Sequence, residues 1–322
     1  MADKFFVSVS PHIHTPTKES IASIMWTVNA VLLPAGIVGI YIFGVSALWV
    51  MLVSILSAVF TEAVIQKARR CKVTVSDGSA FMTGLLLAYN LPPHSPLWLA
   101  AIGSFFAIAV AKQAFGGLGR NIFNPALAGR AFLVAAWPKY MTMFTKPFVY
   151  DAVTQATPLS LMKEGKAGNL FDMSLSYWDL FFGNKGGSLG EVCILVLLLG
   201  GLYLLYKRII TWHIPVTFIL TVWVFAWIFG SPTAGFFKGD PLFHIFSGGL
   251  FLGAIYMATD YVTSPITKKG QLIFGVGCGL LTVVIRIWGG YPEGVCYAIL
   301  IMNAAVSLID RFVQKRRYGV AK

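Results

Sequence analysis

The chain has 322 residues, of which 57% are hydrophobic and only 12% are charged. In soluble domains about a quarter of the residues are charged, so this composition excludes an ordinary soluble enzyme and predicts an integral membrane protein. The formal net charge of +12 does not indicate nucleic-acid binding, because the basic residues lie in short runs at the ends of apolar segments, a pattern that orients membrane proteins.

Neither a targeting segment nor a cysteine framework is predicted. The first twenty residues hold only a short apolar run, so no cleavable signal peptide is expected. The four cysteines have no CxxC spacing, which argues against a disulfide framework or a cluster-binding motif. We expect three small buried residues and one loop thiol among Cys71, Cys193, Cys278 and Cys296.

Ten apolar segments approach the roughly twenty residues that a helix needs to cross a bilayer. The third and fifth are short and rich in glycine and alanine, which is typical of helices inside a bundle where another backbone or a ligand comes close. The sequence therefore predicts an all-α integral membrane protein of about ten transmembrane helices. The predicted spans are 21–43, 45–66, 78–92, 96–115, 124–137, 189–206, 212–230, 241–260, 271–288 and 292–312.

The two halves of the chain resemble each other weakly. Gly84–Pro96 parallels Gly249–Pro265, and Lys112–Gly117 parallels Arg286–Gly290. Five spans per half is an odd number, so the second repeat is expected to run inverted to the first, with a site near the repeat interface. The expected division is an N-terminal segment 1–20, a first five-helix repeat 21–137, a loop 138–188, a second repeat 189–312 and a basic tail 313–322.

The distribution of basic residues predicts the orientation. An even number of spans places both termini on one side, and the tail after the last span carries Lys315, Arg316, Arg317 and Lys322. That side is therefore expected to be cytoplasmic. The short loops predicted on the other side, 93–95 and 289–291, contain no lysine or arginine. The loop 138–188 is then expected on the outer face.

A glycine-rich loop precedes the fifth span. Gly116, Gly117 and Gly119 allow backbone conformations closed to other residues, and an asparagine at 124 followed by Pro125 is typical of a helix N-cap. The free amides and partial positive charge of that helix end, with the Asn121 and Asn124 side chains, would suit a neutral heteroaromatic ring. An ordinary capped helix after a glycine turn explains the same residues, and the loop alone leaves both interpretations open.

Charged residues inside predicted spans are functional hypotheses by default. Lys112 lies about one turn from the end of its span and is expected to extend to the interface. Arg130 lies midway along the short fifth span; we expect it to pair with Glu62 or Asp260, or to meet a phosphate or carboxylate from outside.

Oxygen atoms gather at the end of the eighth span. Asp260 stands next to Thr259 and near Thr263 and Ser264, an arrangement that could hold a cation or a polar ring, or simply end a helix. Glu62 is a candidate ion ligand or an interfacial residue. His244, alone on an apolar helix, is expected to be structural, and no metal site is predicted.

The outer loop contains Asp151-Ala-Val-Thr154-Gln-Ala-Thr157-Pro158. The residue before a proline is pushed toward an extended conformation, so the Thr157 hydroxyl is expected to project, accessible to covalent modification. No other segment suggests covalent chemistry, since the chain lacks a nucleotide-binding glycine fingerprint in its usual context and any hydrolase arrangement.

Three ordered motifs together resemble one family. They are 116–132, Asp151-x-x-Thr-x-Ala-Thr-Pro-Leu and Met257–Pro265. The chain resembles the D subunits of Rnf-type ion-translocating ferredoxin:NAD oxidoreductases and, more distantly, the B subunit of the sodium-pumping NADH:quinone oxidoreductase. The resemblance covers essentially the whole chain.

The resemblance implies two flavins. FMN would be joined through its phosphate to the Thr157 hydroxyl by a flavin transferase, with Asp151 and Thr154 completing the recognised sequence; Gln155 stands where the family usually has glycine. A non-covalent riboflavin would contact Asn121 and Asn124. Arg130 and Asp260 are further candidate cofactor-binding residues.

We therefore predict a flavin-bearing subunit of the bacterial inner membrane with both termini in the cytoplasm. It would relay electrons between ferredoxin and NAD, coupled to Na⁺ or H⁺ movement, as an electron carrier among the other membrane and peripheral subunits of a translocase. An inverted-repeat solute channel or transporter without redox function fits the same spans, because fold does not fix function. A pure scaffold is a third alternative.

Overall fold

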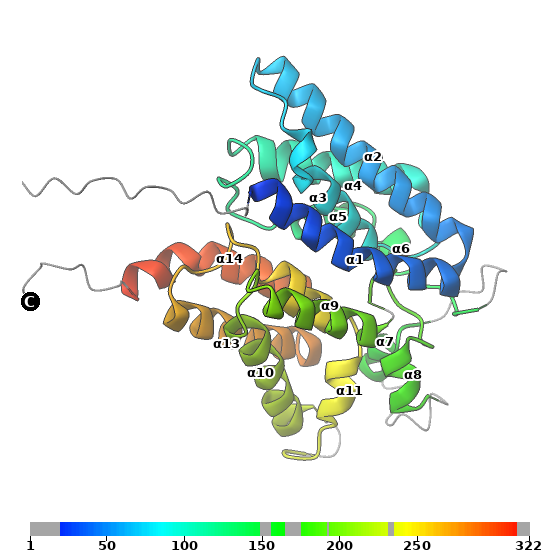
Figure 1. The fold of residues 1–322 in the computed structure, drawn as a ribbon. Coiled ribbons are helices and arrows are strands. Elements are labelled where there is room, and N and C mark those ends of the chain that lie inside the picture. Colours follow the sequence, from blue (N-terminus) through cyan, green and yellow to red (C-terminus); the bar gives the residue numbers. More distant parts are fainter. Residues whose placement is uncertain (1–19, 149–155, 165–174, 192, 231–234, 314–322) are drawn as a thin grey trace, which may run out of the picture.

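The computed structural model describes residues 20–148, 156–164, 175–191, 193–230 and 235–313. Its regular elements are helices (Figure 1). The first half consists of α1 (Ile21–Phe43), α2 (Val45–Ala68), the short 3₁₀ turn η1 (Val75–Asp77), α3 (Ser79–Tyr89), α4 (Leu97–Ile108), its π-helical continuation η2 (Ala109–Gln113), and α5 (Pro125–Ala136).

Three short helices connect the halves: α6 (Pro138–Met141), α7 (Pro158–Lys163) and α8 (Tyr177–Phe182). The second half consists of α9 (Ile194–Tyr206), α10 (His213–Phe229), α11 (Pro241–Phe246), α12 (Leu250–Leu252), the π-helical η4 (Gly253–Met257), α13 (Lys268–Ile287) and α14 (Val295–Phe312).

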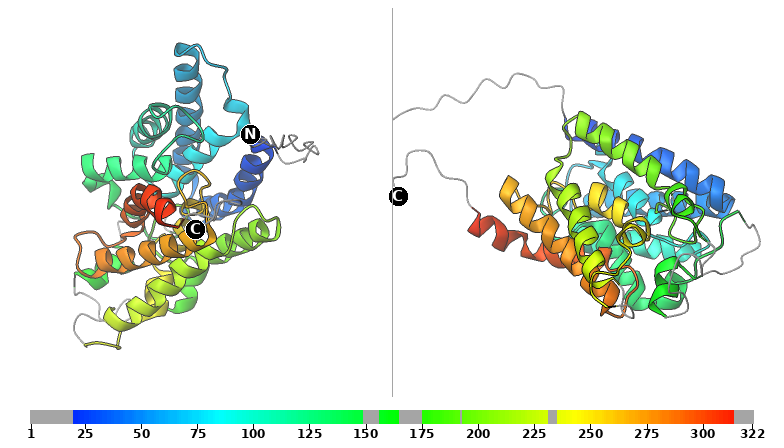
Figure 2. Two further views of the ribbon diagram at one scale, coloured as in Figure 1. Left: turned by 90° about the vertical axis from the view of Figure 1, so that its left-hand side faces the viewer. Right: turned by 90° about the horizontal axis from the view of Figure 1, so that it is seen from below.

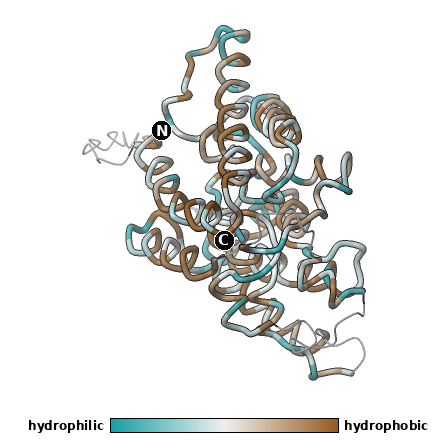
Figure 3. Tube along the Cα trace, turned by 90° about the vertical axis from the view of Figure 1, so that its right-hand side faces the viewer, coloured by the Kyte–Doolittle hydropathy of each residue, from teal (hydrophilic) through white to brown (hydrophobic). Residues whose placement is uncertain are grey.

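The lengths and composition of these helices confirm an integral membrane protein. In the described part of the chain, α1, α2, α13 and α14 are long and apolar enough to cross a bilayer, and α3, α4 with η2, α5, α9 and α10 are shorter apolar helices. Side chains such as Ile37, Leu56 and Phe60 are 64–70% exposed, as expected for a surface that faces lipid. Figure 3 shows this apolar character along the helices and hydrophilic residues at their ends and in loops.

Two predicted spans differ from the helices that form. The segment 241–260 is not one helix, because Ser247–Gly249 separates α11 from α12 and Gly248 has a φ of 71°. The helix predicted from 189 begins only at Ile194, since the backbone amides of Leu189 and Gly190 donate to the carbonyls of Leu91 and Tyr89 at 3.1 and 3.0 Å. The hydropathy of the sequence does not reveal the break at Ser247–Gly249 or the late start of α9, because the residues involved are apolar or small.

Contacts between helices hold the two halves together. Within the first half α2 packs on α3 and α4, and within the second α10 packs on α13, which lies beside α14 (Figure 2). Between the halves α1 contacts α9 and α5 contacts α14. Two tyrosine hydroxyls make matching contacts: Tyr89 donates to the Leu32 carbonyl at 2.6 Å and Tyr256 to the Leu197 carbonyl at 3.0 Å.

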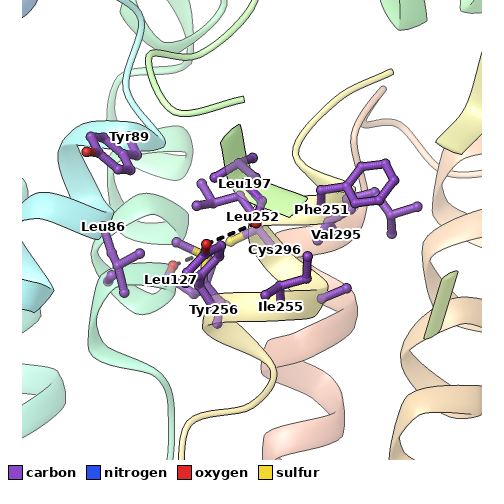
Figure 4. Close-up of a cluster of buried hydrophobic side chains, with 14 of the residues drawn as sticks. Leu86, Tyr89, Leu127, Leu197, Phe251, Leu252, Ile255, Tyr256, Val295 and Cys296 are labelled. Carbon is purple, nitrogen blue, oxygen red and sulfur yellow. Dashed lines mark hydrogen bonds between the residues drawn. The ribbon is translucent and has the colours of Figure 1, made fainter. Parts of the chain in front are cut away.

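The core lies where these helices meet. Figure 4 shows Leu86 and Leu127 of the first half beside Tyr256 of the second, with Cys296 close to Leu127. The cysteines are free: Cys278 and Cys296 are buried and Cys71 is exposed, as predicted, whereas Cys193 is half-buried. This apolar core separates two groups of buried polar side chains.

Candidate functional site

The first group surrounds the N-terminus of α5. Asn124 is its N-cap, as predicted: the side-chain oxygen accepts hydrogen bonds from the amides of Ala126 and Leu127 at 3.1 and 3.4 Å, and Pro125 is the first helical residue. The amide nitrogen of Asn124 donates to the Met257 carbonyl at 3.2 Å. The three preceding glycines have positive φ, as the turn requires: 116° at Gly116, 94° at Gly117 and 89° at Gly119.

The structure brings Asn121, Asn124 and Asp260 together. Asn124 and Asp260 line one narrow cavity of about 60 Å³ between α1, α3 and the end of η4. The Asn121 side chain lies near the Asp260 carboxyl group, and the Thr263 hydroxyl donates to the same carboxylate at 3.3 Å. These three residues therefore form one polar site, which we call the inner site.

A second pocket adjoins the inner site. It has a volume of about 470 Å³, includes Lys207 and Arg208, and shares Ile24, Ile209 and Tyr261 with the narrow cavity. The narrow cavity has apolar walls that end on the Asn124 amide and the Asp260 carboxyl group, a combination that fits the chemistry of a flavin ring. The narrow cavity itself holds only about two water volumes, so a flavin ring would fit beside Asn124 only if side chains that line the cavity moved.

A buried ion pair lies between α2 and η2. Lys112 is 2% exposed, and its ammonium group lies 2.8 Å from Glu62 Oε2 and 2.7 Å from Ser79 Oγ. The other Glu62 oxygen accepts hydrogen bonds from Gln66 and Gln113 at 3.2 and 2.9 Å. The prediction that Lys112 extends to the interface is wrong, because a buried carboxylate is closer than water, and Glu62 is its counterion rather than an interfacial residue.

The second group surrounds Arg130, and here the predicted partners are wrong. Arg130 pairs with neither Glu62 nor Asp260. Its guanidinium donates to Glu293 Oε2 and, at 2.7 Å, to Asn90 Oδ1, and lies 3.6 Å from Glu191 Oε1. These partners come from the end of α3 and from the segments before α9 and α14, so three distant parts of the chain meet at one cation.

Two further cations belong to this outer cluster, which we define as Arg130, Lys185, Glu191, Arg286 and Glu293. Arg286 donates to the backbone carbonyls of His244, Ser247 and Glu293, the last two at 3.2 and 3.1 Å. Lys185 donates to the Phe246 carbonyl. These donors satisfy carbonyl groups that the break between α11 and α12 would otherwise leave unpaired, which explains how the helix can be interrupted inside the protein.

Thr157 lies at the N-cap of α7. Its φ and ψ of −67° and 153° are extended, as the following Pro158 predicts, and its hydroxyl accepts from the Ser160 amide at 3.3 Å and donates to Ser160 Oγ at 3.1 Å. The side chain is only 8% exposed, so the expected open access is wrong: the cap holds the hydroxyl against its own helix. Asp151 and Thr154 lie outside the described residues.

The helix α7 is attached to the outer cluster. Lys163 at its end donates to the carbonyls of Gly289, Ile285 and Tyr291, the last two at 3.4 and 2.9 Å. A Cβ added at Gly248 would lie 2.9 Å from Leu159 Cδ1, 3.3 Å from Arg286 Nη2 and 3.6 Å from Glu293 Oε1. Gly248 therefore touches both α7 and the outer cluster.

Four residues of the outer cluster were missed from the sequence. Glu191, Arg286 and Glu293 each lie inside a predicted span, and a charge within a span is itself a functional signal. Lys185 gives no such signal, because it lies in the long loop before the ninth helix.

The fold and these sites define a multi-pass membrane protein with ionisable groups buried at helix ends and at a broken helix, as in ion-coupled translocases and transporters. The chain belongs to the NQR2, RnfD, RnfE family, whose model matches residues 6–319. The resemblance inferred from the three motifs is thereby confirmed.

Named relatives agree with this assignment. The chain is 52% identical over 318 residues to the D subunit of the Na⁺-translocating ferredoxin:NAD⁺ oxidoreductase complex of Acetobacterium woodii, covering 98% of this chain and 96% of that protein. It is 49% identical over 324 residues to the proton-translocating counterpart of Clostridium ljungdahlii, covering 99% and 97%. It is 35% identical to the D subunit of the ion-translocating oxidoreductase complex of Escherichia coli, covering 99% of both chains.

Proposed function

We propose that this protein is a flavin-bearing membrane subunit of an ion-translocating ferredoxin:NAD oxidoreductase complex of the bacterial inner membrane. The family and the names of relatives that match nearly the full chain support the complex. The observation that carries the flavin role is the Thr157 hydroxyl at the N-cap of α7, a helix whose Lys163 is bonded to the backbone after α13 and whose Leu159 lies against Gly248, next to the outer cluster.

Attachment of FMN at Thr157 needs an activated flavin nucleotide and a transferase. The Thr157 oxygen–phosphorus bond forms as a phosphoanhydride bond of the donor breaks, and the hydroxyl proton passes to a base. Asp151 and Thr154 would complete the sequence that the transferase recognises. The covalent tether would prevent the carrier from diffusing away.

The inner site would hold a second, non-covalent flavin. Asn121 and Asn124 offer amide donors and acceptors to its ring edge, and Asp260 offers an acceptor on the same side. Arg130, six residues beyond Asn124 along α5, belongs to the outer cluster with Glu191 and Glu293 and would contribute to the electrostatic environment of the electron carriers. The flavins supply the redox chemistry when bound, and this chain supplies position and electrostatic environment.

The helices would form two inverted five-helix repeats, with both termini in the cytoplasm. The paired contacts of α1 with α9 and α5 with α14, and the matching hydrogen bonds of Tyr89 and Tyr256, support this arrangement. This arrangement would place the inner site on the cytoplasmic side and Thr157 on the outer side. Electrons would then have two stopping points across the bilayer.

The proposal is tested on a denaturing gel under ultraviolet light and by intact mass. The chain is produced in cells that contain the flavin transferase and in cells that lack it. We expect a fluorescent band and one added FMN with the transferase only. Thr157→Ala abolishes both signals, whereas Ser160→Ala, which removes the neighbouring hydroxyl, retains them. A dark wild-type band in the transferase-containing cells contradicts the covalent flavin and favours the solute-transporter alternative.

A further inference from the structure

Two carboxyl groups converge in the outer cluster. Glu191 and Glu293 lie within hydrogen-bonding reach of each other, and both are paired with the Arg130 guanidinium. Their side chains are only 2% and 16% exposed. Two carboxylates in contact repel each other when both are ionised, so such a pair characteristically shares one proton.

One carboxyl oxygen of Glu191 is available for a hydrogen bond to a bound proton. Its side chain is almost completely removed from solvent, yet Oε1 has no hydrogen-bond partner among the described residues. Arg130 Nη1 is 3.6 Å from this oxygen. Gly249 makes room for the carboxyl group, because a Cβ there would lie 2.6 Å from Oε1. A buried acceptor without a donor is costly, and a proton on the carboxyl pair would supply the missing hydrogen bond.

The surrounding charges determine whether the Glu191–Glu293 pair binds that proton. Three cations and two carboxylates leave the ionised cluster with a net charge of +1, and a bound proton raises it to +2. The cations therefore oppose proton binding and the burial of the acids favours it, so a nearby change of one charge would decide between the two states. Titratable groups that also face the cluster are Cys193, His244, Cys296 and Tyr297.

The carboxyl pair is next to the flavin-attachment helix. The backbone of Gly248 lies between Leu159 on one side and Arg286 and Glu293 on the other. Leu159 is two residues from Thr157 in the sequence. Lys163, at the other end of α7, is bonded to the carbonyls that follow α13. A negative charge added at Thr157 would therefore act on Glu191 and Glu293 through buried protein rather than through water, where its effect would be screened.

We propose that Glu191 and Glu293 form a proton-binding site that takes up one proton when the group at Thr157 is reduced and releases it on reoxidation. The inference rests on the proposed flavin at Thr157. The electron comes from the reduced donor of the complex and leaves to its acceptor. The proton comes from water and returns to it, and only a carboxyl O–H bond is made and broken.

Reduced-minus-oxidised infrared difference spectra of the intact complex test this proposal. We expect reduction to produce a carboxylic acid C=O band that shifts in heavy water. Glu191→Gln keeps the Arg130–Glu293 pair and should lose the band, whereas Glu191→Asp should retain it at a changed frequency. Asp310→Asn, which removes the acid at the opposite end of α14, should leave it unchanged. Proton uptake on reduction, measured with a pH dye, should fall by up to one proton per electron in Glu191→Gln.

The outcomes separate this proposal from the proposed function. Gel fluorescence is recorded for every variant used in the infrared measurement. A fluorescent Glu191→Gln protein whose band and proton uptake equal those of the wild type overturns the proton site and leaves the flavin role standing. If Glu191→Gln fails to fold, an unshifted band in Glu191→Asp overturns it equally. A dark wild-type protein overturns the flavin and the proton site together.

Discussion

Replacing Lys112 with methionine should destabilise the protein more than removing both charges of its ion pair. At 2.8 Å two unit charges attract by about 6 kcal/mol at an effective dielectric constant of 20. This attraction offsets a desolvation cost of several kcal/mol for each ion. Lys112→Met leaves the buried Glu62 carboxylate with only the amide donors of Gln66 and Gln113, and breaking such a pair costs about 3–5 kcal/mol.

The double variant Lys112→Met, Glu62→Gln should recover most of that loss, because a neutral amide at position 62 still bonds the two glutamines. The free energy of unfolding is measured in mixed detergent micelles by circular dichroism. Lys268→Met, at an exposed lysine at the start of α13, is the matched control and should change stability by less than about 0.5 kcal/mol. A Lys112→Met cost below about 1 kcal/mol, or a double variant as unstable as the single one, would refute the reasoning.

Three other perturbations have defined outcomes. Gly84→Ala would place a Cβ 2.7 Å from Ile55 Cα, so it should cost about 1–3 kcal/mol by separating α3 from α2, while Gly290→Ala, in open space, should leave the melting temperature unchanged. Asn124→Ala should cost about 1 kcal/mol through loss of the cap, and Asn124→Asp should recover it; equal losses would show that the contact with Met257 matters more. Burial and the hydrogen bond to Asp240 raise the pKa of Tyr177 from 10.0 to about 12. Because the folded state holds the phenol proton more tightly than the unfolded state, protonated Tyr177 stabilises the folded protein fully below pH 10, and this stabilisation is lost as the pH rises toward 12. Tyr177→Phe should therefore reduce the fall in stability over that window, and an unchanged fall would contradict the assignment.

The sequence predicted those features that depend on local physics. Apolar runs placed most helices, and an asparagine before proline marked the N-cap at position 124 because cap chemistry needs only adjacent residues. The partners of Arg130 could not be predicted, since Glu191 and Glu293 are 61 and 163 residues away and only packing brings them near. The break at Gly248 escaped for another reason: a Ser-Gly-Gly sequence inside an apolar run is a weak signal by itself, and the side chains that satisfy the freed carbonyls, Arg286 and Lys185, come from other elements.

The crossing of α5 and α14 explains why one short helix serves both candidate sites. With its amide suitably oriented, Asn303 of α14 accepts from the Asn124 backbone amide at 3.1 Å, while Arg130 of α5 reaches Glu293, just before α14. The two helices therefore run antiparallel, each beginning beside the interior of the other. At 1.5 Å per residue, Asn124 and Arg130 are about 9 Å apart along α5, and Asn303 is about 12 Å from Val295, the first residue of α14, which Glu293 precedes by two residues. The long arginine side chain bridges the difference. A full-length transmembrane helix in place of α5 would begin at the membrane surface. Because α5 has only twelve residues, Asn124 and Arg130 both stay inside the protein, Asn124 facing the inner site and Arg130 in the outer cluster.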